Sequence, residues 1–477
     1  MIIGSELEGA YLARAAHDEG LKVLMLDPRE KVGGQLLQGQ MLYLDEPTDD
    51  AGNTLLQGQV KTLFQEFKRG NIRKLEEFQV YVDELLSGIP IQSGIEIVDV
   101  QMNQGERKEV KALTYKKSSG EIKTIQAKYW VENTDAAYLS SRLSDTRIPG
   151  VETIFKVDGK AYMASSLMMK FKGVDWKRFQ KEVNALDDSA KADKYGAYTF
   201  VTDTFTWGFG KVGGSFTPSR EDIFLRGLNI LNQGDGEALI NALLIHNVEP
   251  TDEARVQEAV ALGKSETERV LLHLQQKLPG WEEAAINDFP DYLYIRDYDR
   301  YETEYVLTAA DLLSGTMFWD NVSIGGYPLD IQGIQQSPWG VSLGRPDQYG
   351  MPLRSFMLKD YANVVVAGKN VGASAPAYGS ARIQANTALA GEVIGIMLGQ
   401  INGQKSLLDM TEEEMAELQH YIEKKYDIQL VSEGAVNKIK DYSKEELKLI
   451  IEHSRHLRGG GFLGCCSSRN KVVAIFF

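Results

Sequence analysis

Cysteine is nearly absent from this sequence of 477 residues, which has only the adjacent pair Cys465 and Cys466. Two thiols are too few for a disulfide framework, an iron–sulfur cluster or a cysteine-based zinc site. The six histidines show no pairing typical of a metal site. We therefore expect no metal cofactor, a reducing compartment, and two reduced, unpaired thiols.

Long apolar runs are also missing. The chain opens on Met1 and turns polar at Gly4, without the apolar stretch of roughly 7–15 residues that a signal peptide needs. The longest apolar stretch near the end, 388–398, is interrupted by Glu392 and is shorter than the roughly 18 residues of a membrane helix. These absences predict a soluble, cytoplasmic protein without a membrane partner.

Basic clusters are the third absence. The net charge is −15, from 52 Lys and Arg against 67 Asp and Glu, and a field of this sign repels a nucleic-acid backbone. We expect a small-molecule substrate and no nucleic-acid partner, and the oligomeric state stays open. Hydrophobic residues make up 43% of the chain, and its length predicts two or three globular domains of roughly 150 residues.

The first 27 residues have the pattern of a β-α-β unit. Residues 2–3 are a short apolar strand, and good helix formers follow at 10–16. Gly20 ends the helix, and 21–26 is apolar on both strand faces, as a buried parallel strand requires. This pattern predicts an α/β nucleotide-binding fold, although any β-α-β unit with two glycines would show it.

The turn between this strand and helix reads Gly-Ser-Glu-Leu-Glu-Gly. In a dinucleotide-binding turn, Gly4 would make the bend and Gly9 would pack the helix against the strand. Asp27 follows Gly9 by 18 positions, where an acid accepts hydrogen bonds from a ribose. Glu6 replaces the middle glycine, and its charge opposes a pyrophosphate unless the side chain turns outward.

A second glycine pair follows in Pro-Arg-Glu-Lys-Val-Gly-Gly-Gln at 28–35. The run 4–35 resembles the bacterial FAD-dependent oxidoreductases of the glutathione-reductase-like flavoprotein superfamily. In that family, a Gly-Gly pair after the ribose-binding acid lies along the FAD pyrophosphate and ribityl chain. The resemblance implies FAD as the cofactor, bound in this part of the chain by Gly4, Ser5, Glu6, Gly9, Asp27, Arg29, Gly33, Gly34 and Gln35.

A later segment adds to the resemblance. Residues 363–370 have the pattern of a buried strand that ends in glycine, and a helix is predicted from 380 to 398. In the family, an Ala-Gly-Arg strand end and a Gly-Ser-x-Arg helix start close the site over the flavin. Here these segments read Ala-Gly-Lys and Gly-Ser-Ala-Arg, which implies further FAD contacts from Gly368, Asn370 and Arg382.

The predicted helix carries Gly391 and Gly395. Small residues four apart allow a helix to approach a sheet or a cofactor closely, and its N-terminal dipole is suited to negative charge on a reduced flavin. Taken alone, the segment is an ordinary β-loop-α unit. Together with the N-terminal unit, it predicts a cofactor domain built from both ends of the chain.

Three strands are predicted between these segments, at 95–100, 110–115 and 122–131. The last leads into Glu-Asn-Thr-Asp-Ala-Ala, which resembles an Asp-Ala-Thr-Gly-Asp segment of the family. The resemblance implies an FAD contact from Thr134, while Asp135 stands in place of the family's glycine.

The middle of the chain, 151–335, mixes aromatic, turn-rich stretches with helical segments such as 253–278, and predicts an inserted substrate domain. In relatives, a histidine follows the segment 325–331, but this chain has Gln332, which cannot perform the acid–base work of an imidazole. The candidate catalytic groups are therefore Tyr327, Asp330 and Arg354.

Arg354 belongs to Met-Pro-Leu-Arg-Ser, which resembles an Ile-Pro-Tyr-Arg-Ser segment of the family. A guanidinium is suited to clamp an anionic or hydroxyl-rich substrate. The alternative is a structural ion pair between Arg354 and Asp330.

The predicted fold class is α/β. A Rossmann-like FAD-binding domain, discontinuous in sequence, occupies 1–150 and 336–400, and an α+β substrate domain is inserted at 151–335. A small helical appendage and tail follow at 401–477, where capping boxes at Thr411 and Ser443 each open a short helix.

These features predict an FAD-dependent oxidoreductase that passes a hydride from an unidentified organic substrate to flavin N5. One alternative is a flavin-binding protein of the same fold with little or no turnover, which the residues Glu6, Asp135 and Gln332 favour. The other is an NAD-dependent dehydrogenase, because Asp27 also suits NAD.

Overall fold

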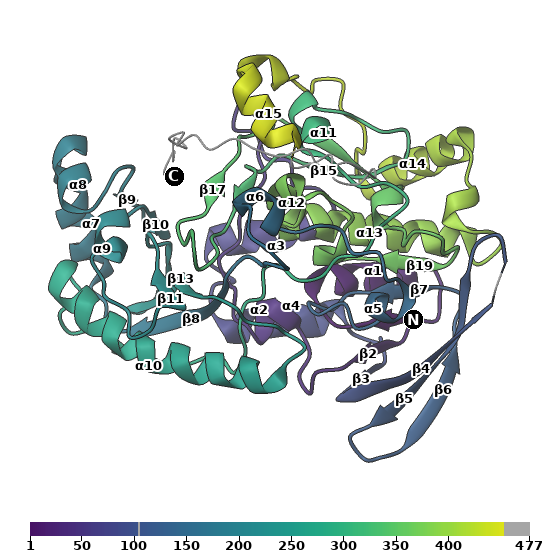
Figure 1. The fold of residues 1–477 in the computed structure, drawn as a ribbon, viewed down its shortest axis with the longest axis horizontal. Helices are drawn as coiled ribbons and strands as arrows, with labels where there is room; N and C mark the ends of the chain where they lie inside the picture. Colours follow the sequence, from purple (N-terminus) through teal and green to yellow (C-terminus); the bar gives the residue numbers. More distant parts are fainter. Residues whose placement is uncertain (104, 453–477) are drawn as a thin grey trace.

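A five-stranded parallel sheet joins the two ends of the chain in the computed structural model, which describes residues 1–103 and 105–452 (Figure 1). The strand order is β19-β7-β1-β2-β3, and Val365 of β19 pairs with Val131 of β7. The predicted Rossmann-like, discontinuous arrangement is therefore confirmed. The strands are β1 (Ile2–Ile3), β2 (Met25–Asp27), β3 (Ile91–Ser93), β7 (Trp130–Glu132) and β19 (Val364–Val366).

Alternate residues of this sheet face two different layers. Ile2, Met25 and Val131 point into a core shared with helices α1 (Leu7–Asp18) and α13 (Gln384–Ile401). Their neighbours, among them Ile3, Leu26 and Trp130, point into a second core. Because both faces are covered, β1 and β19 are wholly apolar, as a buried parallel strand requires, whereas β2 and β7 each end in an acid and the edge strand β3 carries Gln92 and Ser93. Shorter helices complete the helical layer: α2 (Gly34–Leu37), α3 (Gly58–Arg69) and α4 (Leu75–Leu85).

The second core lies under an antiparallel meander of β4 (Ile95–Asn103), β5 (Glu109–Lys117) and β6 (Ile122–Gln126). The prediction of one strand over 122–131 is wrong, because β6 ends at Gln126 and β7 is a separate strand. β6 pairs antiparallel with β5, whereas β7 runs parallel between β1 and β19. The predicted strand at 21–26 is likewise shorter, since β2 begins at Met25.

Helices α1 and α13 touch through small residues. A Cβ atom on Gly391 would lie 2.4 Å from the carbonyl oxygen of Glu8, and one on Gly395 would lie 2.5 Å from that of Leu12. The predicted close approach of this helix is therefore present, but its partner is another helix rather than a sheet or a cofactor. The predicted helix over 380–398 is also divided, with α12 (Ala375–Ala381) ahead of α13.

The middle of the chain forms an antiparallel sheet of order β14-β8-β13-β12-β10-β9, with β11 paired to β13. Phe171, Phe179 and Trp281 pack edge to face in its core. The long helix α10 (Glu253–Lys277) packs on β8 and β13, close to its predicted bounds. The strands are β8 (Ser165–Lys172), β9 (Phe200–Val201), β10 (Phe205–Trp207), β11 (Ile223–Leu225), β12 (Ile230–Gly234), β13 (Glu237–Ile245) and β14 (Ala285–Ile286).

Short elements connect these layers. Two antiparallel pairs, β15 with β18 and β16 with β17, join residues on either side of position 335, and the exact domain boundaries stay a prediction. The pairs comprise β15 (Asn321–Gly325), β16 (Asp330–Ile331), β17 (Val341–Ser342) and β18 (Tyr349–Pro352). The remaining short helices are α5 (Ser140–Leu143), α6 (Glu152–Phe155), α7 (Trp176–Asn184), α8 (Asp188–Lys194), α9 (Gly210–Gly214) and α11 (Ala309–Ser314).

Two helices form the C-terminal appendage, α14 (Glu412–Tyr426) and α15 (Lys444–Glu452), and both predicted capping boxes are present. Met415 and Ile422 of α14 belong to the core that contains α13, so this helix packs on the body of the protein. The tail with Cys465 and Cys466 lies outside the described residues.

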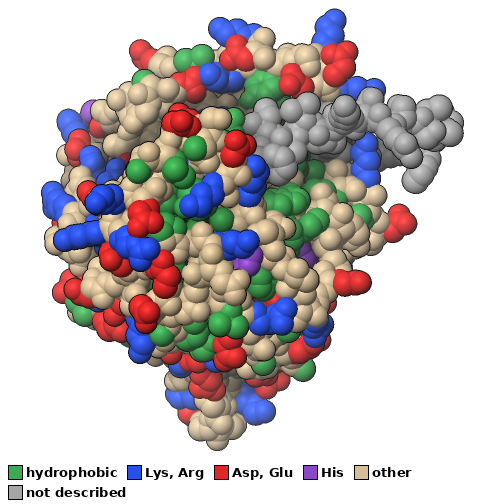
Figure 2. Space-filling model, turned by 90° about the vertical axis from the view of Figure 1, so that its left-hand side faces the viewer, with side chains coloured by type: hydrophobic (Ala, Val, Ile, Leu, Met, Phe, Trp, Pro, Cys, Tyr) green, Lys and Arg blue, Asp and Glu red, His purple; other side chains and the backbone are tan. Residues whose placement is uncertain are grey.

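The surface mixes charges of both signs. On the face shown in Figure 2, basic side chains lie among acidic ones rather than apart from them. Among the described residues, no helix is both long and apolar enough to cross a membrane.

Candidate functional site

The predicted cofactor residues meet at one edge of the parallel sheet, where the strands end at their carboxyl termini. Gly4 follows β1 with φ +96°, and a Cβ atom there would lie 2.2 Å from the carbonyl oxygen of Asn133. After β19, a Cβ atom on Gly368 would lie 3.1 Å from Asn133 Nδ2. The amide of Asn370 donates to the Thr134 carbonyl at 2.8 Å. Segments from both ends of the chain therefore share this edge.

Asn133 is a residue of this site that sequence reasoning missed. Its Oδ1 accepts the backbone N–H of Gly9 at 2.8 Å, so Gly9 packs α1 against the loop after β7. Its Nδ2 is buried without an acceptor among residues 1–103 and 105–452. The available signal was its place directly after a buried strand, next to the predicted contact Thr134.

Asp27 is fully buried at the end of β2. Its Oδ2 accepts the Ser5 hydroxyl, and its Oδ1 accepts the backbone N–H of Arg29 at 2.8 Å. Ser5 Oγ in turn accepts the N–H of Gly33 at 2.9 Å. The predicted ribose-binding acid is thus tied to both glycine-containing turns.

The Glu6 side chain turns inward, towards the second turn, rather than outward. Its carboxylate accepts the backbone N–H of Gln35 at 2.9 Å and an Arg29 N–H at 3.1 Å. It also lies against Gly34, where a Cβ atom would be 2.2 Å from the carboxyl carbon. Only 2% of the Glu6 side chain is exposed, so this carboxylate fills the space between the two turns.

Arg29 lies among three carboxylates. Its guanidinium is 3.1 Å from Glu6, 3.3 Å from Asp135 and 3.5 Å from Asp27, and it lies over the Tyr292 ring. Burial by itself lowers the pKa of Arg29, but Asp135, Asp27 and Glu6 together raise it well above its ordinary value. Asp135, which replaces a family glycine, is therefore used here to hold this arginine.

The donors between the two turns have the chemistry of an anion site. A guanidinium and a backbone N–H both point at the Glu6 carboxylate, and phosphoryl oxygens accept from the same kinds of donor. Asp27 and Ser5 supply the acceptors and donors that a ribose needs. These residues fit the phosphate and ribose parts of FAD, provided that Glu6 releases the two donors.

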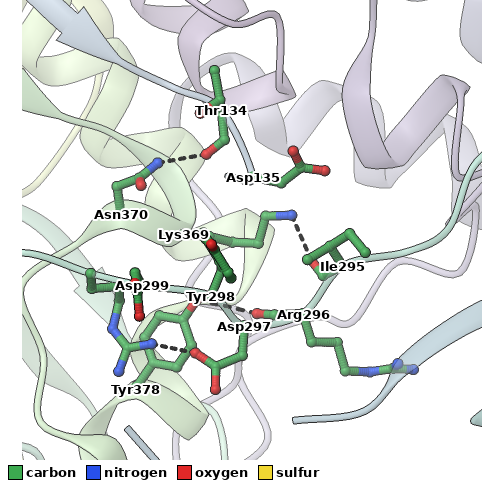
Figure 3. A pocket seen from close by; sticks show the side chains of 11 residues that line it. Thr134, Asp135, Ile295, Arg296, Asp297, Tyr298, Asp299, Lys369, Asn370 and Tyr378 are labelled. Atoms are coloured by element: carbon green, nitrogen blue, oxygen red, sulfur yellow. Dashed lines mark hydrogen bonds and ion pairs between the residues drawn. The ribbon is translucent and has the colours of Figure 1, made fainter. Parts of the chain in front are cut away.

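A strap of residues 295–300 crosses the ends of β7 and β19 (Figure 3). Lys369, which replaces the arginine of the family, donates to the Ile295 carbonyl at 2.7 Å. The Tyr378 hydroxyl donates to the Arg296 carbonyl at 3.2 Å. The side chain of Arg296 points away from this group in Figure 3. The strap is thus anchored to the cofactor edge through its backbone.

Arg354 lies apart from the other two candidate catalytic residues, Tyr327 and Asp330. Arg354 forms a two-point ion pair with the buried Asp320, at 2.9 and 3.0 Å, and lies over the rings of Tyr305 and Trp319. The alternative of an ion pair between Arg354 and Asp330 is therefore wrong. Sequence spacing could not reveal the real partner, because Asp320 lies in no recognisable motif.

Asp330 instead lies beside Arg382. Arg382 Nη2 is 3.7 Å from Asp330 Oδ2 and donates to the Asp330 carbonyl at 3.3 Å. Gln332 Nε2 donates to the same carboxylate at 2.7 Å. Burial raises the pKa of Tyr327 well above its ordinary value, and nearby Asp45 and Asp330 raise it further. A predicted cofactor residue and two predicted catalytic residues thus share one neighbourhood.

A small cavity opens in this neighbourhood, and we name it the Arg382 cavity. Burial, with a further contribution from Asp330, raises the pKa of Asp45 to about 6. Gln35 Oε1 is buried without a donor in the part of the chain that the structure describes. The cavity joins the second glycine turn to the start of α13, and its lining residues are Gln35, Met41, Tyr43, Asp45, Tyr294, Arg382, Ile383 and Gln384. Sequence reasoning missed Asp45 and Tyr294, which belong to no motif.

Solved structures with a distantly similar arrangement include flavoenzymes. A myxobacterial FAD-dependent halogenase, CndH, aligns at a TM-score of 0.40 and 12% identity, over 95% of this chain and 90% of the halogenase. The p-nitrophenol 4-monooxygenase of Pseudomonas putida aligns at a TM-score of 0.39 and 9% identity, over 87% and 82% of the two chains. Such low scores support no conclusion about the substrate. No curated protein sequence matches the chain.

The sequence itself decides the family. The model of the family described as FAD dependent oxidoreductase matches residues 1–421, which is most of the chain. This match confirms the resemblance seen in the two turns. It favours FAD as the cofactor over NAD, the alternative that Asp27 left open. The chain belongs to the FAD-dependent oxidoreductase family and is a flavin-dependent redox enzyme whose cofactor is FAD.

Proposed function

We propose that this enzyme oxidises a small organic substrate bound in the Arg382 cavity, with hydride transfer to flavin N5. The observation that carries the proposal is the meeting of two groups of residues. Gln35 follows the second glycine turn of the cofactor site, and it lines the same cavity as Arg382, which contacts Asp330. A substrate in this cavity would lie between the cofactor edge and the middle domain.

The cofactor would be held by the two turns and the loop after β19. Asp27 and Ser5 would bind the ribose, Arg29 and the N–H of Gln35 the pyrophosphate, and Gly368 and Asn370 would face the flavin end. When bound, FAD accepts a hydride and so supplies the redox chemistry. The protein residues need only bind the substrate, orient it and handle one proton.

Asp45 is the residue suited to take that proton. A carboxylate with a pKa of about 6 is poised near neutral pH, where a general base works best. Tyr327 is kept protonated by its raised pKa, so its hydroxyl is a hydrogen-bond donor rather than a base. We therefore assign proton acceptance to an Asp45 carboxylate oxygen and substrate orientation to Arg382, which both line the cavity.

The test is a visible absorption spectrum of the purified protein, before and after incubation with FAD. We expect the bands of oxidised flavin, and anaerobic bleaching by at least one member of a panel of sugars, organic acids and amines. Asp45→Asn should slow the bleaching while leaving the flavin bound. A protein that takes up no FAD would refute the proposal.

The alternative is a flavin-binding protein with little turnover. It is favoured by the Glu6 carboxylate between the two turns and by Gln332, which cannot titrate. Bound flavin that no member of the panel bleaches would support this alternative.

A further inference from the structure

Three arginines lie around the Arg382 cavity, of which Arg382 alone is among the residues that line it. Arg382 donates to the Tyr294 hydroxyl at 3.4 Å, and the guanidinium of Arg296 lies 4.4 Å from the centroid of the same ring. Arg226 donates to Gln332 Oε1, and the other side of that amide binds Asp330 at 2.7 Å. Arg226 belongs to the middle domain, Arg296 belongs to the strap, and Arg382 directly follows α12.

Carboxylates do not balance this charge. Among residues 1–103 and 105–452, Arg382 has one carboxylate within 4.0 Å, that of Asp330, and Arg226 and Arg296 have none. The Arg296 guanidinium donates to two neutral oxygens, the Ala164 carbonyl and Ser166 Oγ, both at 2.9 Å. Asp45, the other nearby acid, is mostly ionised at neutral pH because its pKa is about 6, so two carboxylates face three guanidinium groups. The cavity therefore carries net positive charge.

Burial makes this excess charge costly. Arg296 is only 3% exposed, and its burial, with contributions from Arg226 and Arg382, lowers its pKa to about 9. Buried charges in proteins are normally paired, because an unpaired ion loses its hydration without compensation. A bound anion would supply the missing partner.

Donors without acceptors line the same cavity. Arg382 is 6% exposed, and its Nε has no hydrogen-bond partner among the described residues. In the same part of the chain, the buried Nε2 of Gln384 also has none. Both residues line the Arg382 cavity. An anion there would satisfy hydrogen-bonding groups as well as charge.

We propose that Arg382, supported by the nearby charges of Arg226 and Arg296, forms an anion site that binds the carboxylate of a small organic acid, the substrate class of this enzyme. This assignment rests on the proposed function, because it places the substrate in the Arg382 cavity. The cavity measures about 20 Å³, somewhat more than the roughly 10–15 Å³ that one water molecule requires.

Binding to the purified full-length protein tests the proposal without turnover. The probes are lactate, succinate and benzoate, each compared by calorimetric titration with its uncharged amide. We expect at least one carboxylate to bind tenfold or more tightly than its amide. Equal binding of acid and amide, or no binding of any of the three acids, would overturn the anion site.

Arg226→Gln is the informative variant, because Arg226 is only partly buried and its replacement keeps a polar side chain beside Gln332. We expect at least a tenfold loss of carboxylate affinity, with Arg226→Lys in between because the charge remains. The matched control is Arg178→Gln, an exposed arginine paired with Glu182 and Glu282, which should leave affinity unchanged. Equal effects of Arg226→Gln and the control would overturn the proposal.

The phosphates of the cofactor are another source of anion. Competition with inorganic pyrophosphate and with FAD separates the two sources. Carboxylate binding that neither displaces supports a substrate site, whereas displacement by pyrophosphate would assign the arginines to the cofactor and overturn the proposal. FAD uptake is measured separately by absorbance, so a protein that binds carboxylates but no FAD would refute the proposed function and leave the anion site standing.

Discussion

The Glu6 carboxylate accepts the backbone N–H of Gln35 at 2.9 Å, which places a negative charge between the two turns of the cofactor site. The same carboxylate takes a hydrogen bond from Arg29. A phosphate that uses these donors has to compete with Glu6 for them, and the like charges repel. Glu6 therefore bears directly on the affinity for FAD.

Glu6→Gly should raise FAD affinity by about tenfold or more, since roughly 1.4 kcal/mol of relieved competition corresponds to a factor of ten. The measurement is a titration of flavin-free protein with FAD, in which quenching of the flavin fluorescence reports binding. Glu6→Gln, which removes the charge but keeps a polar side chain, should fall in between. Glu96→Gln, at an exposed glutamate paired with Lys116, serves as the control. Unchanged or weaker FAD binding by Glu6→Gly would contradict this view.

Glu8 should make stability depend on pH. Burial, with a further contribution from Glu6, raises the pKa of Glu8 from 4.5 to about 7. The folded protein therefore holds this proton more tightly than the unfolded chain, and stability falls as pH rises from 4.5 to 7. The loss amounts to about 3 kcal/mol.

Urea unfolding of wild type and Glu8→Gln at several pH values checks this expectation. The difference in unfolding free energy between the two proteins should grow in favour of the variant between pH 4.5 and 7. Asp45, whose pKa is also raised, contributes equally to both and cancels in the difference. Parallel pH profiles for the two proteins would show that Glu8 does not titrate in this range.

The contact between α1 and α13 should tolerate no side chain at Gly391. A Cβ atom there would lie 2.4 Å from a backbone oxygen, which cannot move as a flexible side chain can. Gly391→Val should cost about 3 kcal/mol of unfolding free energy, as measured by urea denaturation. Gly210→Ala is the matched control, because open space surrounds Gly210, and it should change stability by less than about 0.5 kcal/mol. Equal changes in unfolding free energy for Gly391→Val and Gly210→Ala would show that α1 and α13 can move apart at little cost.

Arg354 should matter for stability rather than for redox chemistry. Asp320 is 1% exposed, so Arg354→Met would leave a buried carboxylate unpaired. We expect the unfolding free energy to fall by about 2–4 kcal/mol. The loss is smaller than for a fully buried ion pair because 32% of the Arg354 side chain is exposed. FAD affinity and the rate of anaerobic bleaching should stay within about twofold of wild type. A large drop in the bleaching rate with unchanged stability would return Arg354 to the catalytic site.

The parts of the fold that were predictable are those encoded locally. The β-α-β unit is specified by two apolar strands, by the glycines between them and by Asp27 at the end of the second strand. Each of these signals depends only on residues that are close in the sequence. Gly391 and Gly395 likewise signalled a close contact, but a spacing of four residues does not identify what is approached. The contact partner, α1, depends on how the two ends of the chain fold together.

The Arg382 cavity was beyond such reasoning. Asp45, Arg226 and Arg296 come from separate segments, and no motif marks any of them. Their charges are brought together only by tertiary packing of the strap against the middle domain and α12. The pairing of Arg354 with Asp320 could not be predicted for the same reason. The two residues are far apart in the sequence and are brought together only by the folded chain.

Because β19 lies beside β7, the parallel sheet can be completed only late in synthesis of the chain. Until residues 364–366 leave the ribosome, the edge of β7 has no neighbour, and an open strand edge can pair with other chains. The intervening middle region has to be made first and can already fold while the nucleotide domain is incomplete. A chaperone or a rapidly folding insert during that interval would protect the nascent chain from aggregation.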